Sequence, residues 1–162
     1  MKITGYEATA LAIPEDDPLA NMPEEAGRKR PIVIVRLRTD PGIEGIGVTL
    51  YGGRLNGALR SAVEALAALT VGEDPMRVEA VVARLRTLGD AGGPGGLFTL
   101  ALSAIDTALW DIKGKVLNQP LWKLLGGHRD RVATYASGSL RRGLTDDQAQ
   151  RAAQILLQKG FR

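Results

Sequence analysis

Two aspartates on one predicted helix are candidates for catalysis, because paired carboxylates can act as a general acid and a general base. The sequence predicts a helix over residues 97–116, which contains Asp106 and Asp111. Five residues of an α-helix turn through about 500°, so these carboxylates point about 140° apart and form no pair. Asp111 and Lys115 are four residues apart, a spacing typical of a structural ion pair. We therefore predict structural roles for both acids.

The remaining candidate catalytic side chains lack partners in the sequence. The chain has no cysteine, which excludes disulfides, thiolate metal sites and a cysteine nucleophile. His128 is the only histidine and stands among charged residues, so we expect it to be solvated. Ser103 lacks the G-x-S-x-G setting of a nucleophile elbow. The glycine-rich segment 89–96 matches neither phosphate-binding pattern, which favours a connector between helices.

Composition and charge are typical of a globular protein. The 162 residues carry a net charge of +3, with 44% hydrophobic and 24% charged residues. Basic residues are scattered among acids except in Arg28-Lys29-Arg30, which argues against nucleic-acid binding. No apolar run approaches the roughly 18–20 residues that span a bilayer, and the start has no signal-peptide core. We expect a cytoplasmic protein that binds neither nucleic acid nor a membrane.

The first third of the chain predicts an antiparallel meander of three strands. Residues 2–13 alternate as a strand does, 31–38 are rich in β-branched residues, and 43–51 return after the turn signal Asp40-Pro41-Gly42. Residues 14–30 lose all periodicity and hold three prolines and five acids. This segment is therefore predicted to be a long loop, a kind of segment that is usually functional or disordered.

Helices are predicted to follow the meander. Apolar residues recur at helical spacing in two sets, Leu59, Ala62, Val63, Leu66 and then Val78, Val81, Val82, Leu85. Asp74-Pro75 predicts an N-cap followed by proline in the first turn of the second helix. The helix over 97–116 is apolar nearly all round, so we expect it to be central. A short helix is predicted from Pro120 to Gly126-Gly127.

The end of the chain predicts one β-loop-α unit. Residues 131–136 are typical of a strand. Thr145 and Gln148 have the spacing of a capping box at the start of a helix over 145–159, and Gly160 suits the position after its end. One buried strand with one helix cannot satisfy its own backbone groups. We therefore expect the chain to stop in the middle of an α/β architecture.

Two consecutive sequence segments resemble the signature of a known protein family. They are the stretch Ala104–Lys115 and its continuation Pro120–Gly127, which are similar to the signature of the mandelate racemase and muconate-lactonizing branch of the enolase superfamily. The resemblance implies an α+β capping domain over residues 1–125, a three-stranded antiparallel meander and then a helical bundle. It further implies that residues 126–162 are the first, incomplete β/α unit of a (β/α)7β TIM-like barrel.

The resemblance also implies an activity. Members of this family hold a Mg²⁺-bound carboxylate substrate and remove its α-proton, and the implied ligands and bases lie beyond Arg162. No catalytic or metal-binding residue is therefore carried over to this segment, which alone is not expected to be active. The activity that we favour for the whole enzyme is dehydration of an acid sugar, and we expect the enzyme to form a homo-oligomer. The alternatives are a racemase or epimerase, a cycloisomerase, or a non-catalytic cap fragment of a split enzyme.

What the resemblance does transfer is a lid that selects the substrate. Two loops of the family's capping domain close over the barrel mouth, and they match residues 14–30 and about 50–57. Arg54 is the leading specificity residue, because a guanidinium favours a second carboxylate or a polyol. A solvated Arg54 is the equally weighted alternative. Met22 and Tyr51 are weaker lid candidates, and Ser137 would either bind substrate oxygen or cap local backbone.

Overall fold

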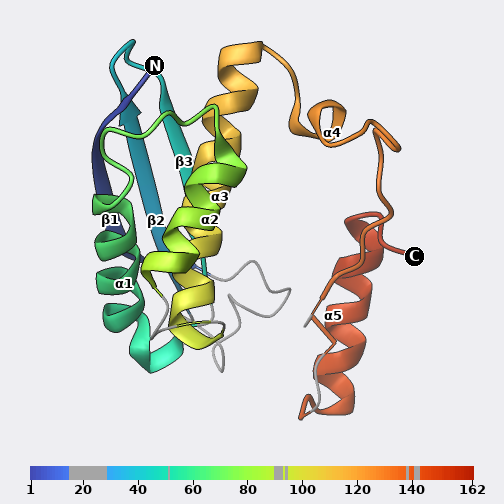
Figure 1. Cartoon of the computed structure of the whole chain (residues 1–162). Coiled ribbons are helices and arrows are strands. Elements are labelled where there is room, and N and C mark those ends of the chain that lie inside the picture. Colours follow the sequence, from blue (N-terminus) through green and yellow to red (C-terminus); the bar gives the residue numbers. More distant parts are fainter. Residues whose placement is uncertain (15–28, 51, 90–92, 94, 138, 141–142) are drawn as a thin grey trace. The chain divides into compact units, whose positions relative to one another are not determined.

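Three strands form a single antiparallel sheet in the order β1-β2-β3 (Figure 1). A computed structural model describes residues 1–14, 29–50, 52–89, 93, 95–137, 139–140 and 143–162. The strands are β1 Ile3–Pro14, β2 Lys29–Thr39 and β3 Glu44–Thr49. In the antiparallel pairing of β2 with β3, Val35 lies opposite Gly47. The predicted three-stranded antiparallel sheet is confirmed.

Alternation along β2 determines which face of the sheet is covered. Val33, Val35 and Leu37 are fully buried, whereas Arg36 and Arg38, which alternate with them, are exposed. Side chains of a strand point to opposite faces in turn. One face of the sheet therefore belongs to the core, and the other carries charge.

Helices α1 Asn56–Ala68, α2 Val78–Leu88 and α3 Gly96–Leu117 cover the apolar face of the sheet. The other described helical segments are the 3₁₀ turn η1 Gly53–Leu55, α4 Leu121–Leu124 and α5 Asp146–Gln158. α3 packs against β3, α1 and α2 (Figure 1). Eight of its residues are buried, as expected for a helix that is apolar nearly all round.

Close packing of α3 on β3 depends on small residues in both elements. Methyl groups placed on Gly45 and Gly47 would overlap the backbone carbonyl oxygens of Ala108 and Ala104, respectively. Ala104 and Ala108 are themselves fully buried. Two residues of the family-like signature therefore serve to bring a helix against a strand.

The prediction for the start of α2 was wrong. Asp74 does not cap the helix: its side chain accepts a hydrogen bond from the backbone N–H of Met76 at 3.0 Å. That bond closes a local turn two residues on, the alternative that aspartate offers the backbone. The helix then begins at Val78, with Arg77 in the N-cap position.

The end of α5 and its start follow the sequence pattern. The Thr145 hydroxyl accepts from the Gln148 N–H, and the Gln148 side chain accepts from the Thr145 N–H. Gly160 has φ +91°, and the Phe161 N–H donates to the Leu156 carbonyl at 3.1 Å. The capping box and the glycine stop of the helix are both confirmed.

The chain divides into two compact units. The first comprises Met1–Ala12 with Pro31–His128, and the second Ile13–Arg30 with Arg129–Arg162. The expected domain boundary between residues 125 and 126 stays a prediction.

Residues 131–136 do not form the expected barrel strand. A strand of a parallel sheet needs neighbouring strands to pair its N–H and C=O groups. The described residues provide none for this segment, since the sheet contains β1, β2 and β3 alone. Side chains of the segment are exposed accordingly, Val132 by 75% and Tyr135 by 81%.

Candidate functional site

The second segment that was predicted to form a lid is, in its described part, a tight turn between β3 and α1. Gly53 has φ +52°, and the Leu55 N–H donates to the Gly52 carbonyl at 2.8 Å, which closes η1. Arg54 is exposed on this turn. Within the described ranges its guanidinium has no ion-pair or hydrogen-bond partner.

The other predicted lid residues are placed differently. Met22 and Tyr51 lie outside the described residues. Ser137 is exposed, its N–H donates to the Tyr135 carbonyl at 3.0 Å, and it belongs to the second unit whereas Arg54 belongs to the first. The roles predicted for these residues stay predictions.

Asn56, which the sequence analysis did not single out, lies at the base of the turn. Its side-chain Nδ2 donates to the Ile32 carbonyl of β2 at 3.4 Å. Its Oδ1 is buried and accepts no hydrogen bond from the part of the chain that the structure describes. The signal available in the sequence was an amide directly after the Gly52–Leu55 turn, but its partner lies 24 residues away.

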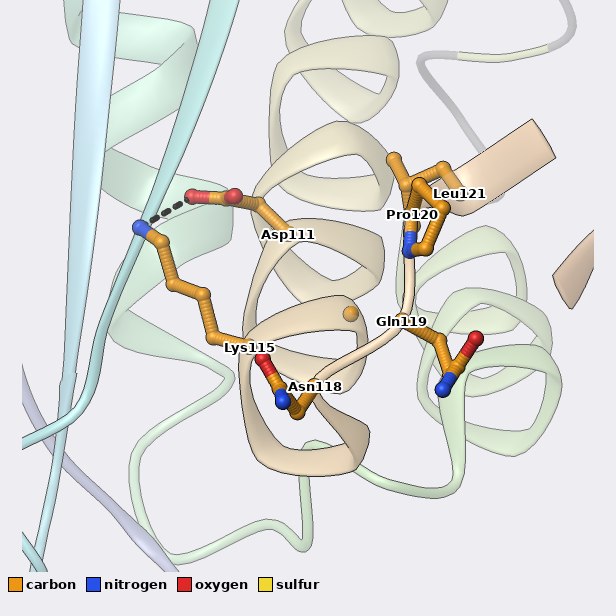
Figure 2. A pocket seen from close by; sticks show the side chains of 7 residues that line it. Asp111, Lys115, Asn118, Gln119, Pro120 and Leu121 are labelled. Atoms are coloured by element: carbon orange, nitrogen blue, oxygen red, sulfur yellow. Dashed lines mark hydrogen bonds and ion pairs between the residues drawn. The ribbon is translucent and has the colours of Figure 1, made fainter. Parts of the chain in front are cut away.

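A hollow of about 410 Å³ lies at the C-terminal end of α3 (Figure 2). Asp111 Oδ2 accepts from the Ile46 N–H at 2.8 Å and from Lys115 Nζ at 2.7 Å. Lys115 Nζ also donates to the Glu44 carbonyl at 2.7 Å. The predicted Asp111–Lys115 ion pair is confirmed, and both charges are bound to the edge of β3.

The rest of this hollow contains no free acid or base. Asn118, Gln119, Pro120 and Leu121 line it (Figure 2). Asn118 adopts a left-handed conformation with φ +49° and ends α3. Amides and apolar groups cannot take a proton from carbon at neutral pH, so these four described residues offer no general base.

Asp106 faces α2 and has a perturbed carboxyl group. Burial raises the pKa of the Asp106 carboxyl above its ordinary value, the carboxylate of Glu79 raises it further, and the guanidinium of Arg86 opposes both. Burial and like charge both disfavour the ionised form. Asp111, the other carboxylate of α3, is bound to the Ile46 N–H and to Lys115 instead.

The described residues offer no arrangement that fits a metal ion. Among them, no three histidine or acidic side chains come together as ligands. Mg²⁺ is bound through carboxylates and other oxygen ligands. Asp111 is bound to the Ile46 N–H and to Lys115, and neither acid of α3 belongs to a group of three possible ligands among the described residues. Within the described ranges, no helix is long and apolar enough to cross a membrane.

Comparison with known sequences decides the family. The family described as mandelate racemase / muconate lactonizing enzyme, N-terminal domain, matches residues 8–126. The chain belongs to this family. It is thereby assigned to the enolase superfamily, and the resemblance carried by Ala104–Lys115 is confirmed.

Two curated members of the family illustrate the range of its chemistry. The chain is 35% identical over 140 residues to L-talarate/galactarate dehydratase of Salmonella typhimurium, covering 83% of this chain and 35% of the relative. It is 36% identical over 156 residues to D-galactarolactone cycloisomerase of Agrobacterium fabrum, covering 96% of this chain and 40% of the relative. The chain thus spans less than half the length of these enzymes.

A solved structure shares the fold. L-Talarate dehydratase from Polaromonas sp. JS666, complexed with Mg and L-glucarate, matches with a TM-score of 0.79 and 25% identity. The match covers 97% of this chain and 43% of that chain. The match therefore includes residues of both units of this chain. This chain again corresponds to less than half the length of the similar protein.

Proposed function

We propose that this chain is the N-terminal, substrate-selecting part of a Mg²⁺-dependent enzyme that removes the proton α to a carboxylate. The proposed reaction is dehydration of an acid sugar. A base takes the α-proton, hydroxide leaves the β-carbon, and the resulting enol becomes a 2-keto-3-deoxy acid. The base and the metal ligands are proposed to lie outside the described residues, so the ion is assigned no contact with them.

One observation carries this proposal: the likeness to L-talarate/galactarate dehydratase over 83% of the chain. The structural likeness to a talarate dehydratase complexed with Mg and L-glucarate supports it. A second candidate is cycloisomerisation of an acid-sugar lactone, because the likeness to D-galactarolactone cycloisomerase covers 96% of the chain. Both candidates use carboxylate substrates derived from sugars.

Arg54 is the residue that we propose selects the substrate. Its guanidinium is exposed on a tight turn and has no partner among the described residues. Bound to a second carboxylate it would form charge-assisted hydrogen bonds, which are about twice as strong as neutral ones. Met22 and Tyr51 are proposed to complete the lid, and Ser137 to bind a substrate oxygen. The enzyme is proposed to be a homo-oligomer.

The test compares a sugar diacid with a monoacid in the enzyme that contains this chain. We expect Mg²⁺-dependent turnover of galactarate or L-talarate, with Arg54→Gln raising the KM for the diacid. Loss of a charge-assisted hydrogen bond costs about 1.5–3 kcal/mol, which is about 10- to 100-fold in affinity. The KM for D-galactonate, which lacks the second carboxylate, should change less than about threefold.

The matched control is Arg60→Gln, which removes an arginine of α1 that pairs with Glu64 at 3.4 Å. It should leave both KM values unchanged. Turnover of the lactone alone would favour the cycloisomerase. If no acid sugar or lactone is turned over with Mg²⁺, the proposed function is wrong.

A further inference from the structure

Asn56 connects the turn that carries Arg54 to the sheet. The turn Gly53–Leu55 ends where α1 begins, at Asn56. From there the side-chain Nδ2 reaches the Ile32 carbonyl in β2 at 3.4 Å. One side chain thus joins the β3–α1 connection to a strand that lies 24 residues earlier in the sequence.

The other end of the same turn also rests on Asn56. Gly52 is buried, and a Cβ added there would lie 3.0 Å from Asn56 Cα, 3.1 Å from Asn56 Oδ1 and 3.1 Å from Leu59 Cδ2. A side chain at position 52 would therefore be crowded by Asn56 and Leu59. Asn56 thus lies close to Gly52 at one end of the turn and directly follows Leu55 at the other, with Arg54 between them.

The second polar atom of Asn56 shows that stability alone does not account for this residue. Oδ1 is buried and unpartnered among the described residues. Burying an unsatisfied acceptor costs about 1–3 kcal/mol, which an apolar side chain of the same shape would avoid. What the amide adds is direction: Nδ2 donates to the Ile32 carbonyl of β2, and Oδ1 lies on the side of Gly52.

We infer that Asn56 is a positioning residue for Arg54. Its amide fixes the Gly52–Leu55 turn relative to β2 and so sets where the guanidinium is presented. The structural part of this inference stands on the contacts above. Its consequence for substrate binding rests on the proposed function.

The first test uses amide hydrogen exchange in the 162-residue chain. Asn56→Leu removes both polar atoms, and Asn56→Asp keeps the shape but replaces the donor with an oxygen. We expect either variant to speed exchange of the Leu55 N–H at least about tenfold, because that amide closes the turn on Gly52. Exchange in the rest of α1 should change less than about twofold. The urea midpoint of Asn56→Leu should change little, because the lost donor to Ile32 is offset by removal of the buried, unpartnered Oδ1.

A matched control is Ser61→Ala, which removes a hydroxyl of α1 that donates to the Gly57 carbonyl at 3.2 Å. It should leave exchange of the Leu55 N–H unchanged. The inference is overturned if Leu55 exchange is unaltered in both Asn56 variants. It is also overturned if the whole of α1 speeds up together with a lower midpoint, since Asn56 would then be a structural residue only.

The second test uses the enzyme and a double-mutant cycle. Asn56→Leu should raise the KM for the diacid with little change in kcat, and it should add nothing once Arg54 is replaced by glutamine. Additive effects of the two substitutions would show that Asn56 does not act through Arg54. An enzyme inactive on all acid sugars would refute the proposed function, but the exchange result would still decide the structural inference.

Discussion

At the scale of single residues, Gly45 and Gly47 decide how closely α3 approaches the sheet. Each faces a backbone carbonyl oxygen of α3, contributed by Ala108 and Ala104 respectively. Backbone cannot yield as a flexible side chain can, so a Cβ at either of these two positions must push helix and strand apart. Interiors packed this tightly respond to a single methyl group.

We predict that Gly47→Ala destabilises the fold by about 3 kcal/mol, at the upper end of the usual cost of overpacking. Urea unfolding of the chain measures the change. The control is Gly57→Ala in α1, where an added Cβ meets nothing within 4 Å. There alanine should stabilise by about 0.5–1 kcal/mol through helix propensity. An unchanged midpoint for Gly47→Ala would contradict the observed packing.

At the scale of elements, α3 closes the free edge of β3. An exposed edge presents unpaired N–H and C=O groups that invite pairing with another chain. Asp111 takes the N–H of Ile46, and Lys115 takes the carbonyl of Glu44. Two charged side chains of one helix thereby replace a missing neighbouring strand.

We predict that Asp111→Ala costs about 1–3 kcal/mol, because the Ile46 N–H loses its acceptor. Exchange of the Ile46 amide should become faster than that of its neighbours in β3. The comparison variant is Arg60→Ala, which breaks a solvent-exposed pair on α1 and should cost no more than about 0.5 kcal/mol. Equal costs for the two substitutions would mean that the Asp111 contacts contribute nothing to the sheet.

The sequence predicted these elements better than their contacts. The Thr145 capping box and the Asp111–Lys115 pair were predicted correctly because their partners lie within one helical turn. The hydrogen bond from Ile46 to Asp111 spans 65 residues, and no local pattern encodes it. Asp74 matched an N-cap pattern, but bonding to Met76 prevailed, a choice between two local options that the sequence permits equally.

The candidate site was predictable only in part, for the same reason. Arg54 could be proposed from its charge and its place in a loop. Asn56 was missed because its hydrogen-bond partner, Ile32, lies in β2, 24 residues earlier in the sequence. A residue that acts through packing across strands leaves little trace in a single sequence.

At the scale of the whole molecule, the two units differ in how much apolar surface each buries within itself. The first has a core drawn from the sheet, α1, α2 and α3. In the second, Ala152 and Leu156 of α5 are the buried apolar residues within the described ranges. Residues 131–136 carry exposed apolar side chains and belong to no strand. Stability should therefore be unequal along the chain.

We predict that amide exchange of the 162-residue chain separates these two parts. Amides of Val33, Val35 and Leu37 should be protected at least about 100-fold more than those of residues 131–136, because they are paired in a buried strand. α5 should be intermediate, slowed by its capped ends. Slow exchange across residues 131–136 would show that this segment finds strand partners in solution, and the prediction would then be wrong.

The packing of Ala104 and Ala108 on two glycines has a consequence for how the family diversifies. The most recognisable stretch of the chain is occupied with joining a helix to a strand, so it places no demand on which bond is broken. A lineage can replace its loops and exchange a dehydration for a ring closure while this joint is inherited unaltered. The residues that identify the family of such a protein are thus different from the residues that determine its reaction. The two sets can therefore change at different rates.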